Sequence, residues 1–135
     1  MFPSMLSQGD QGEALAVAWL MSQGWQIALP IGNCSDYDVV ADIDGRLVKV
    51  QVKTTRYFRN ERWHVSLCTA GGNQSWTGVV KRFSPTRCDY LYAHTACGRR
   101  WFIPASQVEG GRGALLGGPK YAEFEVDAGP RLTLS

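Results

Sequence analysis

The 135-residue sequence lacks several features, and each absence removes a class of protein. No run approaches the eighteen apolar residues of a membrane-spanning helix, and the first four residues carry no charge and lead into no long apolar segment. We therefore expect neither a membrane protein nor a secreted precursor. The four cysteines form no C-x-x-C pair and there are only two histidines, so we expect free thiols and no zinc site. The sequence predicts a soluble, cytoplasmic protein with a single domain over residues 1–135.

Acidic residues are scarce in the middle of the chain. From Lys53 to Arg100, nine Lys and Arg residues stand against Glu61 and Asp89, a balance of +7 in a protein whose formal charge is +2. Acidic residues gather instead at the two ends and between residues 36 and 44. A basic middle beside an acidic pocket suits a phosphate backbone as ligand, although charge alone is equally compatible with a solvated basic surface.

The main feature that is present is a pair of β-branched runs on either side of Asp44-Gly45. This dipeptide favours a type I′ hairpin turn, in which both central residues need a positive φ. With the turn there, Asp38 lies opposite Gln51, and Lys53 lies on the same face because side chains alternate with period two. The other face carries only apolar residues and is expected to be buried: Val39, Ala41, Val48, Val50 and Val52. A carboxylate, an amide oxygen and an ammonium on one face can hold a divalent metal beside a phosphate.

A helix is predicted over residues 8–23, and it is apolar on nearly every face, as in a helix packed on a sheet. Ser7 can cap its start, and Gly24 can end it. Glu13 is unusual because no Lys or Arg lies three or four residues away to pair with it. A first-turn Glu is ordinarily explained by the helix dipole. Because the hairpin presents Asp38 and Lys53 on its polar face, we favour a place for Glu13 in the active site.

Glu13, Asp38 and the triplet Gln51-Val52-Lys53 resemble, in order and spacing, the signature of the PD-(D/E)XK nucleases. That signature has a Glu on a helix, an Asp at the end of one strand and a D/E-X-K triplet on the next. The likeness is greatest to the small group I intron-associated (homing-type) endonucleases, where Gln also occurs in the triplet. It runs from Gly12 to Tyr121. The resemblance implies an α/β fold with a restriction-endonuclease-like core: a mixed central β-sheet, a long N-terminal helix and short flanking helices.

The resemblance also implies a Mg²⁺-dependent DNA endonuclease that leaves 5′-phosphate and 3′-hydroxyl ends, with Mn²⁺ as a possible substitute. The metal would be held by hard oxygen donors from Asp38, Gln51, the backbone carbonyl of Val52 and Glu13. Glu13, Asp38, Gln51 and Lys53 would be catalytic, with Lys53 orienting or deprotonating the attacking water. Because each chain has one compact site, a cut through both strands of double-stranded DNA suggests a homodimer or larger homo-oligomer.

Basic and aromatic residues alternate after the hairpin as far as Trp63, where a strand is expected to begin. The pattern is typical of a rim that contacts phosphates and stacks rings on sugars or bases, and also of a solvated turn. The residues we expect to bind DNA are Arg56, Arg59, Arg62, Lys81, Arg82 and Arg87. Asp36 is a helper of the site, an ion-pair partner of Lys53 or an ordinary turn residue at the strand edge.

The remaining elements are short. Residues 76–83 fit the spacing of a helix, but Ser84-Pro85 suits the start of a separate helical turn, and we favour the latter. The other expectations are a strand over 25–30, a hairpin over 89–94 and 100–103, a helical turn within 104–108, a glycine-rich loop over 109–119, a last strand over 121–126 and a loose tail over 128–135.

Two other functions remain compatible with the sequence. The same fold and chemistry serve structure-specific nucleases of repair or recombination, such as Holliday-junction resolvases. Gln51 in place of an acidic residue could instead mark a DNA-binding module whose catalytic site has decayed. Against decay, Glu13, Asp38 and Lys53 are all present.

Overall fold

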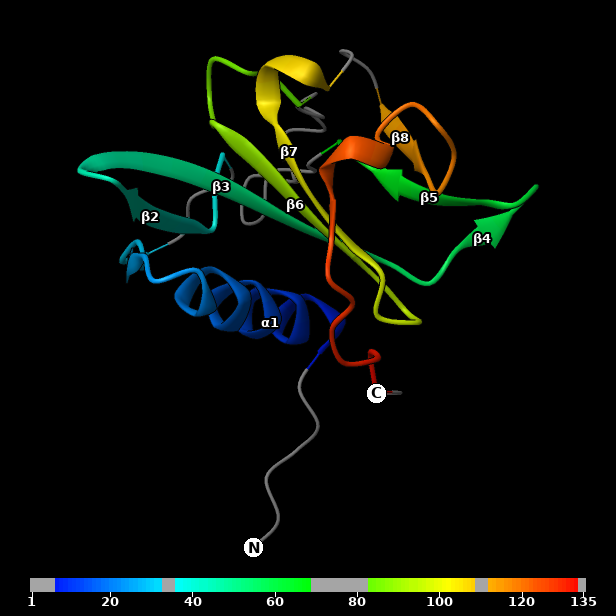
Figure 1. Ribbon diagram of the computed structural model, residues 1–135, viewed down its shortest axis with the longest axis horizontal. Helices are drawn as coiled ribbons and strands as arrows, with labels where there is room; N and C mark the ends of the chain where they lie inside the picture. The colour runs from blue at the N-terminus through cyan, green and yellow to red at the C-terminus, as the bar shows by residue number, and fades with distance from the viewer. Residues whose placement is uncertain (1–6, 33–35, 69–82, 109–111, 134–135) are drawn as a thin grey trace, which may run out of the picture.

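Two β-sheets and one long helix make up the protein in the computed structural model, which describes residues 7–32, 36–68, 83–108 and 112–133 (Figure 1). The larger sheet has the strand order β1-β2-β3-β6-β7-β9, and the smaller has the order β4-β5-β8. Strand β3 pairs with β6 in parallel, and the other pairs are antiparallel. The strands are β1 (Gln26–Ala28), β2 (Val39–Ile43), β3 (Arg46–Thr55), β4 (Phe58–Arg59), β5 (Arg62–Ser66), β6 (Tyr90–Thr95), β7 (Arg100–Pro104), β8 (Gly113–Leu116) and β9 (Glu125–Val126). The predicted α/β fold with a mixed central sheet is confirmed.

The β2–β3 hairpin has the predicted turn and register. Asp44 and Gly45 have φ values of 54° and 87°, as a type I′ turn requires, and Val39 pairs with Val50. The carboxylate of Asp42 also accepts a 2.8 Å hydrogen bond from the Gly45 N–H, which fixes the turn. Of the apolar face, Val39, Ala41, Val48 and Val50 are buried and Val52 is half-buried.

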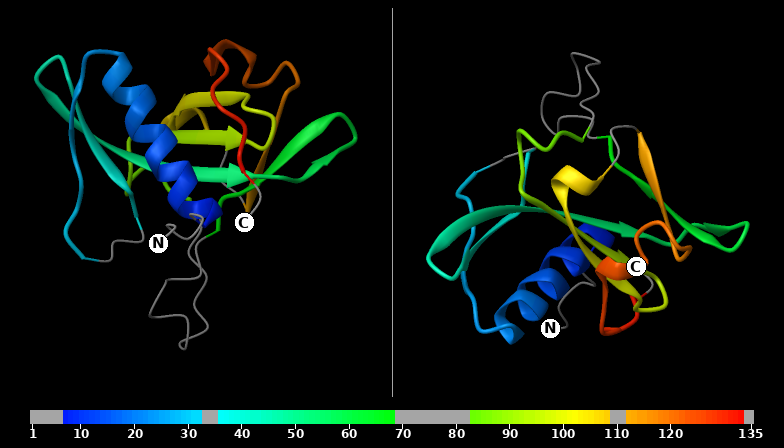
Figure 2. Two further views of the ribbon diagram at one scale, coloured as in Figure 1. Left: turned by 90° about the horizontal axis from the view of Figure 1, so that it is seen from below. Right: turned by 45° about the horizontal axis from the view of Figure 1, so that its top comes forward.

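Helix α1 (Gln8–Ser22) covers one face of the larger sheet (Figures 1 and 2). It begins at the predicted cap, since the Ser7 hydroxyl accepts from the Asp10 N–H at 3.1 Å, and it is followed by Gly24 with φ 89°. Its buried side chains pack against β2, β3 and β6 in one core cluster: Ala16, Trp19, Leu20, Val39, Ala41, Val48, Val50 and Tyr92. The helix therefore brings Glu13 near Asp38, which lies just before β2, and near β3, which holds Lys53.

The smaller sheet lies against the opposite face of the larger one. Its inward side chains Trp63, Val65 and Leu116 share a second core cluster with larger-sheet residues Leu91, Ala93, Trp101 and Ile103. Strands β4 and β5 extend outward from this cluster as a short ribbon (Figure 1). The molecule thus has three layers, with the larger sheet in the middle.

Several of the short elements are confirmed. A turn closes at Ser84, whose carbonyl accepts from the Arg87 N–H at 3.1 Å, and a 3₁₀ helix η2 spans Ala105–Gln107. The β6–β7 hairpin also has the expected position. The helix considered over 76–83 lies largely outside the described residues, as do Lys81 and Arg82.

Three expectations for the C-terminal quarter are wrong. The glycine-rich loop contains β8, because Ala114 and Leu116 alternate into the core despite the glycines around them. The last strand is mostly replaced by the 3₁₀ helix η3 (Ala122–Phe124), and only Glu125–Val126 pairs as β9. Residues 128–133 form no loose tail, since Leu132 is buried and its N–H donates to the Ala96 carbonyl at 3.1 Å. No helix in the described ranges is both long and apolar enough to span a membrane.

Candidate active site

Asp38 stands immediately before β2, at the point where that strand stops pairing with β3. Its backbone N–H donates to the Val50 carbonyl at 2.9 Å. Its carboxylate then takes the place of the next backbone partner, because Oδ2 accepts from both the Val52 N–H and the Gln51 amide nitrogen, each at 2.8 Å. Two donors on one oxygen fix the carboxylate, and Oδ1 accepts no hydrogen bond from the described residues.

Gln51 and Val52 present two further oxygens at this corner. The Gln51 side chain is 7% exposed, and because its nitrogen donates to Asp38, its oxygen is the end available to another ligand. The N–H and carbonyl of one residue point to the same side of a strand, so the Val52 carbonyl lies on the side that Asp38 occupies. Asp38 Oδ1, the Gln51 amide oxygen and the Val52 carbonyl are hard donors of the kind that Mg²⁺ prefers.

Lys53 is half-buried on β3 and within electrostatic reach of Asp38. Burial lowers the pKa of the Lys53 ammonium below 10.5, while the carboxylate of Asp38 opposes that shift. Burial also raises the pKa of Asp38, opposed by the Val52 N–H and by Lys53. The two groups support each other's charged forms in a place that otherwise disfavours charge.

Glu13 reaches the same corner from α1. Its side chain is exposed, yet its pKa is raised by partial burial and then by repulsion from Asp38 and Asp10. A cation between Glu13 and Asp38 would relieve that repulsion, so the residues present fit a divalent metal. Within the described residues no three His, Cys, Asp or Glu side chains cluster as metal ligands. The residue beside Asp38 on β3 is the neutral Gln51, whose amide oxygen carries no charge.

Asp36 forms an ion pair with Arg87, whose Nε lies 3.5 Å from Oδ1 of Asp36. The sequence did not predict Arg87 as a partner of Asp36. It joins the segment before β2 to the turn after Ser84 and holds Arg87, one of the predicted DNA-contacting residues, on the Asp36 side of the molecule.

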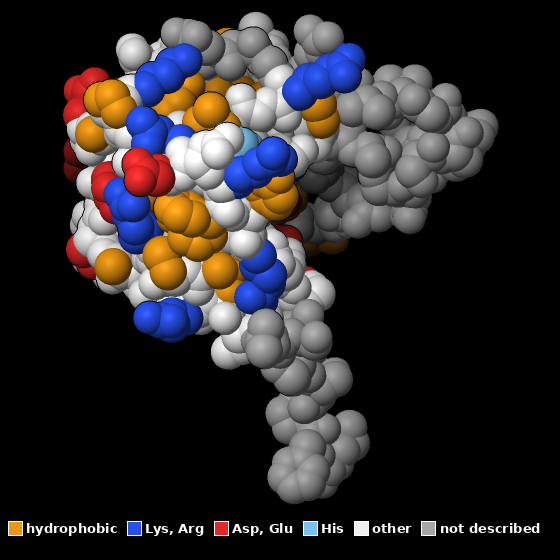
Figure 3. All heavy atoms as spheres, turned by 90° about the vertical axis from the view of Figure 1, so that its right-hand side faces the viewer, with side chains coloured by type: hydrophobic (Ala, Val, Ile, Leu, Met, Phe, Trp, Pro, Cys, Tyr) orange, Lys and Arg blue, Asp and Glu red, His pale blue; other side chains and the backbone are white. Residues whose placement is uncertain are grey.

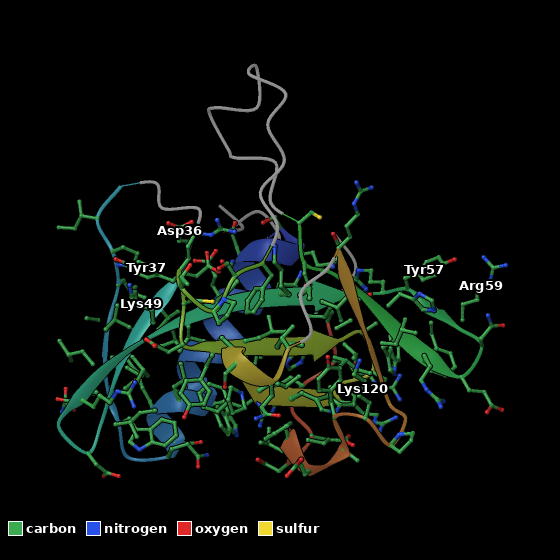
Figure 4. All side chains as sticks on the ribbon, turned by 90° about the horizontal axis from the view of Figure 1, so that it is seen from above. Asp36, Tyr37, Lys49, Tyr57, Arg59 and Lys120 are labelled. Atoms are coloured by element: carbon green, nitrogen blue, oxygen red, sulfur yellow. The ribbon has the colours of Figure 1, made fainter. Side chains whose placement is uncertain are left out.

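The other predicted DNA-contacting residues that the structure describes do not form one cluster. The Arg56 guanidinium bonds internally to Gln8 and to the backbone of residue 133. Arg59 and Arg62 lie on the β4–β5 ribbon, where Arg59 donates to the Tyr57 hydroxyl at 3.3 Å. Figure 4 shows Tyr57 and Arg59 at the opposite end of the molecule from Asp36 and Lys49.

Sequence reasoning missed part of the basic surface beside the ribbon. Arg112 and Lys120 are exposed on the chain around β8, and the aromatic residues Tyr57 and Phe58 are 51% and 53% exposed. Figure 3 shows Lys and Arg side chains interspersed with hydrophobic ones on the side of the molecule from which the ribbon projects. The sequence feature that could have indicated this surface is the presence of basic residues in and beside the glycine-rich segment over 109–119, for which we predicted a loop.

Comparison with known proteins identifies the family of the chain and a similar fold. The family model of the PD-(D/E)XK endonucleases matches residues 4–107, and the chain belongs to that family. A solved structure similar to this one is that of a bacterial homing endonuclease, I-Ssp6803I, with a TM-score of 0.65 and 20% sequence identity over 87% of this chain and 84% of that one. At that identity the likeness concerns the fold, which is restriction-endonuclease-like. None of the curated proteins matches the sequence.

Proposed function

We propose that the protein is a Mg²⁺-dependent DNA endonuclease of the homing type, with Mn²⁺ able to substitute, that leaves 5′-phosphate and 3′-hydroxyl ends. The observation that carries the proposal is the corner at the end of β2. There Asp38 is fixed by two hydrogen bonds at 2.8 Å, beside the Gln51-Val52-Lys53 triplet and within electrostatic reach of Glu13. Family membership and the homing endonuclease among similar structures support it.

The metal would be held by Asp38, Gln51, the Val52 carbonyl and Glu13. When bound, a divalent cation lowers the pKa of an attacking water and stabilises charge on the phosphate. The chain's own part is to fix these oxygens before substrate arrives. Asp38 Oδ2 is committed to two donors, so Oδ1 keeps one orientation, and the half-buried position of Lys53 excludes part of the competing water.

Lys53 places an ammonium beside the metal ligands. Its lowered pKa brings it closer to the range in which Nζ can release or accept a proton, and in its charged form it neutralises charge that develops on the phosphate. The basic residues proposed to bind the DNA backbone are Arg59, Arg62, Arg87, Lys81 and Arg82. A homodimer or larger assembly would supply a second site for the second strand.

The test is incubation of the protein with supercoiled plasmid in Mg²⁺, Mn²⁺ or EDTA. We expect nicked and linear products with either metal and none with EDTA. Products that a ligase rejoins without prior treatment carry 5′-phosphate and 3′-hydroxyl ends. Linear and four-way-junction duplexes of matched sequence separate the proposed function from a structure-specific nuclease, since a resolvase would cut only the junction.

Lys53→Ala is the sharpest variant for this proposal. We expect it to abolish cleavage while DNA binding stays nearly intact, because Lys53 acts on one phosphate whereas binding sums many contacts. Lys49→Ala, on the same strand, is the matched control and should cut normally. Cleavage by Lys53→Ala at the wild-type rate, in a gel-based time course, would remove Lys53 from the site. Tight plasmid binding with no cleavage by the wild type in either metal would favour a decayed DNA-binding module.

A further inference from the structure

The segment after β9, residues 127–133, crosses from the larger sheet to the start of α1, and we call it the C-terminal strap (Figures 1 and 2). Asp127 accepts from the Trp19 indole N–H at 3.2 Å. The Pro130 carbonyl bonds to His94 at 2.8 Å, and the Gly129 N–H donates to the Gly98 carbonyl at 2.8 Å. With Leu132 buried, the strap is anchored along most of its length.

The end of the strap is bound by the side chain of Gln11. The Thr133 N–H donates to the Gln11 oxygen at 2.8 Å, and the Gln11 amide nitrogen donates back to the Thr133 carbonyl at 3.2 Å. Gln11 and Glu13 are two residues apart, which is about 200° around a helix. The strap therefore holds the side of α1 away from Glu13 and leaves that carboxylate free to face Asp38.

Arg56 completes the connection from the sheet side. It directly follows β3, and its Nε donates to the Gln8 side-chain oxygen at 2.7 Å while another guanidinium nitrogen donates to the Thr133 carbonyl. The Gln8 amide nitrogen in turn donates to the Thr54 hydroxyl at 2.8 Å. The planar fork of an arginine thus joins the end of β3, the first turn of α1 and the strap through two separate nitrogens, whereas a lysine would have a single nitrogen in place of the fork.

We propose that Gln11, Arg56 and Thr133 form a brace that positions Glu13 against Asp38, and that Arg56 is a positioning residue and not a phosphate contact. The inference rests on the metal site proposed above. The Glu13 side chain makes no hydrogen bond or ion pair with the described residues, so its location depends on where α1 lies relative to β3. The brace fixes that relation at the turn of α1 that precedes Glu13.

The first test uses Arg56→Lys and Gln11→Ala in the full-length chain, with Arg59→Lys as the matched comparison. Arg56→Lys keeps the charge and loses the fork, whereas Gln11→Ala changes no charge. We expect both variants to raise, by about tenfold, the Mn²⁺ concentration that gives half of the maximal increase in melting temperature. Losing a residue that orients a metal ligand typically weakens metal binding by this amount. We also expect faster amide hydrogen exchange over residues 8–16, with β3 and β6 unchanged. Arg59→Lys should change neither quantity.

A second measurement separates bracing from phosphate contact. The slope of log affinity against log salt is measured for a short duplex of random sequence without metal. Arg56→Gln should keep the wild-type slope, whereas Arg59→Gln should flatten it by about one unit. The brace is overturned if Arg56→Lys has the same amide hydrogen exchange over residues 8–16 and the same Mn²⁺ requirement for stabilisation as the wild type. It is also overturned if Arg56→Gln flattens the slope of log DNA affinity against log salt. If the wild type shows no Mn²⁺ response and no cleavage, the proposed function fails, and the exchange measurement alone still decides whether the brace exists.

Discussion

Asp38 keeps its charge at a cost to folding stability. Burial raises its pKa, and although the Val52 N–H and Lys53 oppose that effect, the net shift stays upward. At neutral pH the folded protein therefore holds a carboxylate that would be easier to ionise in the unfolded chain. Such a cost is expected where a site is arranged for binding and not for stability.

Asp38→Asn should separate these two roles. Both of the hydrogen bonds to Asp38 end on one oxygen, so the single oxygen of Asn can accept them while the charge disappears. We expect cleavage to be lost and the metal-free melting temperature at neutral pH to be equal to or higher than that of the wild type. Adding Mg²⁺ should raise the melting temperature of the wild type only. A clear fall in the metal-free value would show that the carboxylate stabilises the fold.

Gln51 offers a neutral oxygen where a third carboxylate would bind metal more strongly. Gln51→Glu should lower the Mg²⁺ concentration that cleavage requires, and Gln51→Ala should raise it sharply. The added charge also raises the pKa of Lys53. If Lys53 acts as a cation, Gln51→Glu keeps its activity; if it acts as a base, activity falls and the pH optimum rises. The measurement is a Mg²⁺ titration of cleavage at several pH values, and superimposed curves for all three proteins would exclude Gln51 as a ligand.

Among the elements, the contact between α1 and β3 sets the geometry of the site, and Gly12 makes it possible. A Cβ on Gly12 would lie 2.4 Å from Cγ2 of Thr54, well inside van der Waals contact. Thr54 has little freedom to move, because its hydroxyl accepts from Gln8 and its β-branched side chain is restricted at χ1. The helix therefore lies directly on the strand, one residue before Glu13.

Gly12→Ala should destabilise the protein by about 1–3 kcal/mol, which is typical of overpacking. In the same background, Thr54→Ser removes Cγ2 and keeps the hydroxyl. We expect the double variant to recover, and it could exceed the wild type because Ala favours a helix over Gly by about 1 kcal/mol. Denaturant unfolding of the two single variants and the double variant measures this. If Gly12→Ala lowers the free energy of unfolding equally with and without Thr54→Ser, the added Cβ clashes with an atom other than Cγ2 of Thr54.

The elements that were predictable are those defined by neighbouring residues. Asp44-Gly45 specifies its hairpin by turn chemistry alone, and that register brings Asp38 beside Gln51 without further information. The parallel pairing of β3 with β6 has no comparable local signal. The strap was missed for the same reason, because it is ordered by Gln11 and His94, which lie far away in the sequence.

At the scale of the whole molecule, a buried polar network joins β6, β7 and the strap around His94. Its Nδ1 accepts from the Tyr92 hydroxyl and its Nε2 donates to the Pro130 carbonyl, each at 2.8 Å. Arg100 donates to the carbonyl of Asp127 at 2.7 Å and forms an ion pair with its carboxylate at 3.3 Å. Both nitrogens of His94 are used in the neutral form, so protonation would cost it the bond from Tyr92.

This arrangement predicts that stability falls in mild acid. Burial lowers the pKa of His94 below 6.5, with Arg100 acting in the same direction and the bond to Pro130 against it. The unfolded chain therefore takes up the proton first. As the pH drops below about 6.5, the free energy of unfolding should decrease by up to about 1.4 kcal/mol per pH unit, until the folded His94 titrates. Denaturant unfolding from pH 7.5 down to pH 5 checks this.

His94→Gln should be less stable at neutral pH, and its free energy of unfolding should depend much less on pH between 7.5 and 5. His64→Gln should keep the pH dependence of the wild type. An unchanged slope in His94→Gln would place the acid sensitivity in another group.

The bond between Gln11 and Thr133 joins residues that are 122 positions apart. During synthesis, α1 leaves the ribosome well before its partner on the strap, which emerges only after residue 133 has been added. Closing a loop of that length is slow compared with forming the β2–β3 hairpin. A nascent chain can therefore build the Asp38 corner early, yet the helix that carries Glu13 is secured only afterwards. The order of translation thus delays assembly of the complete site until the strap has been made.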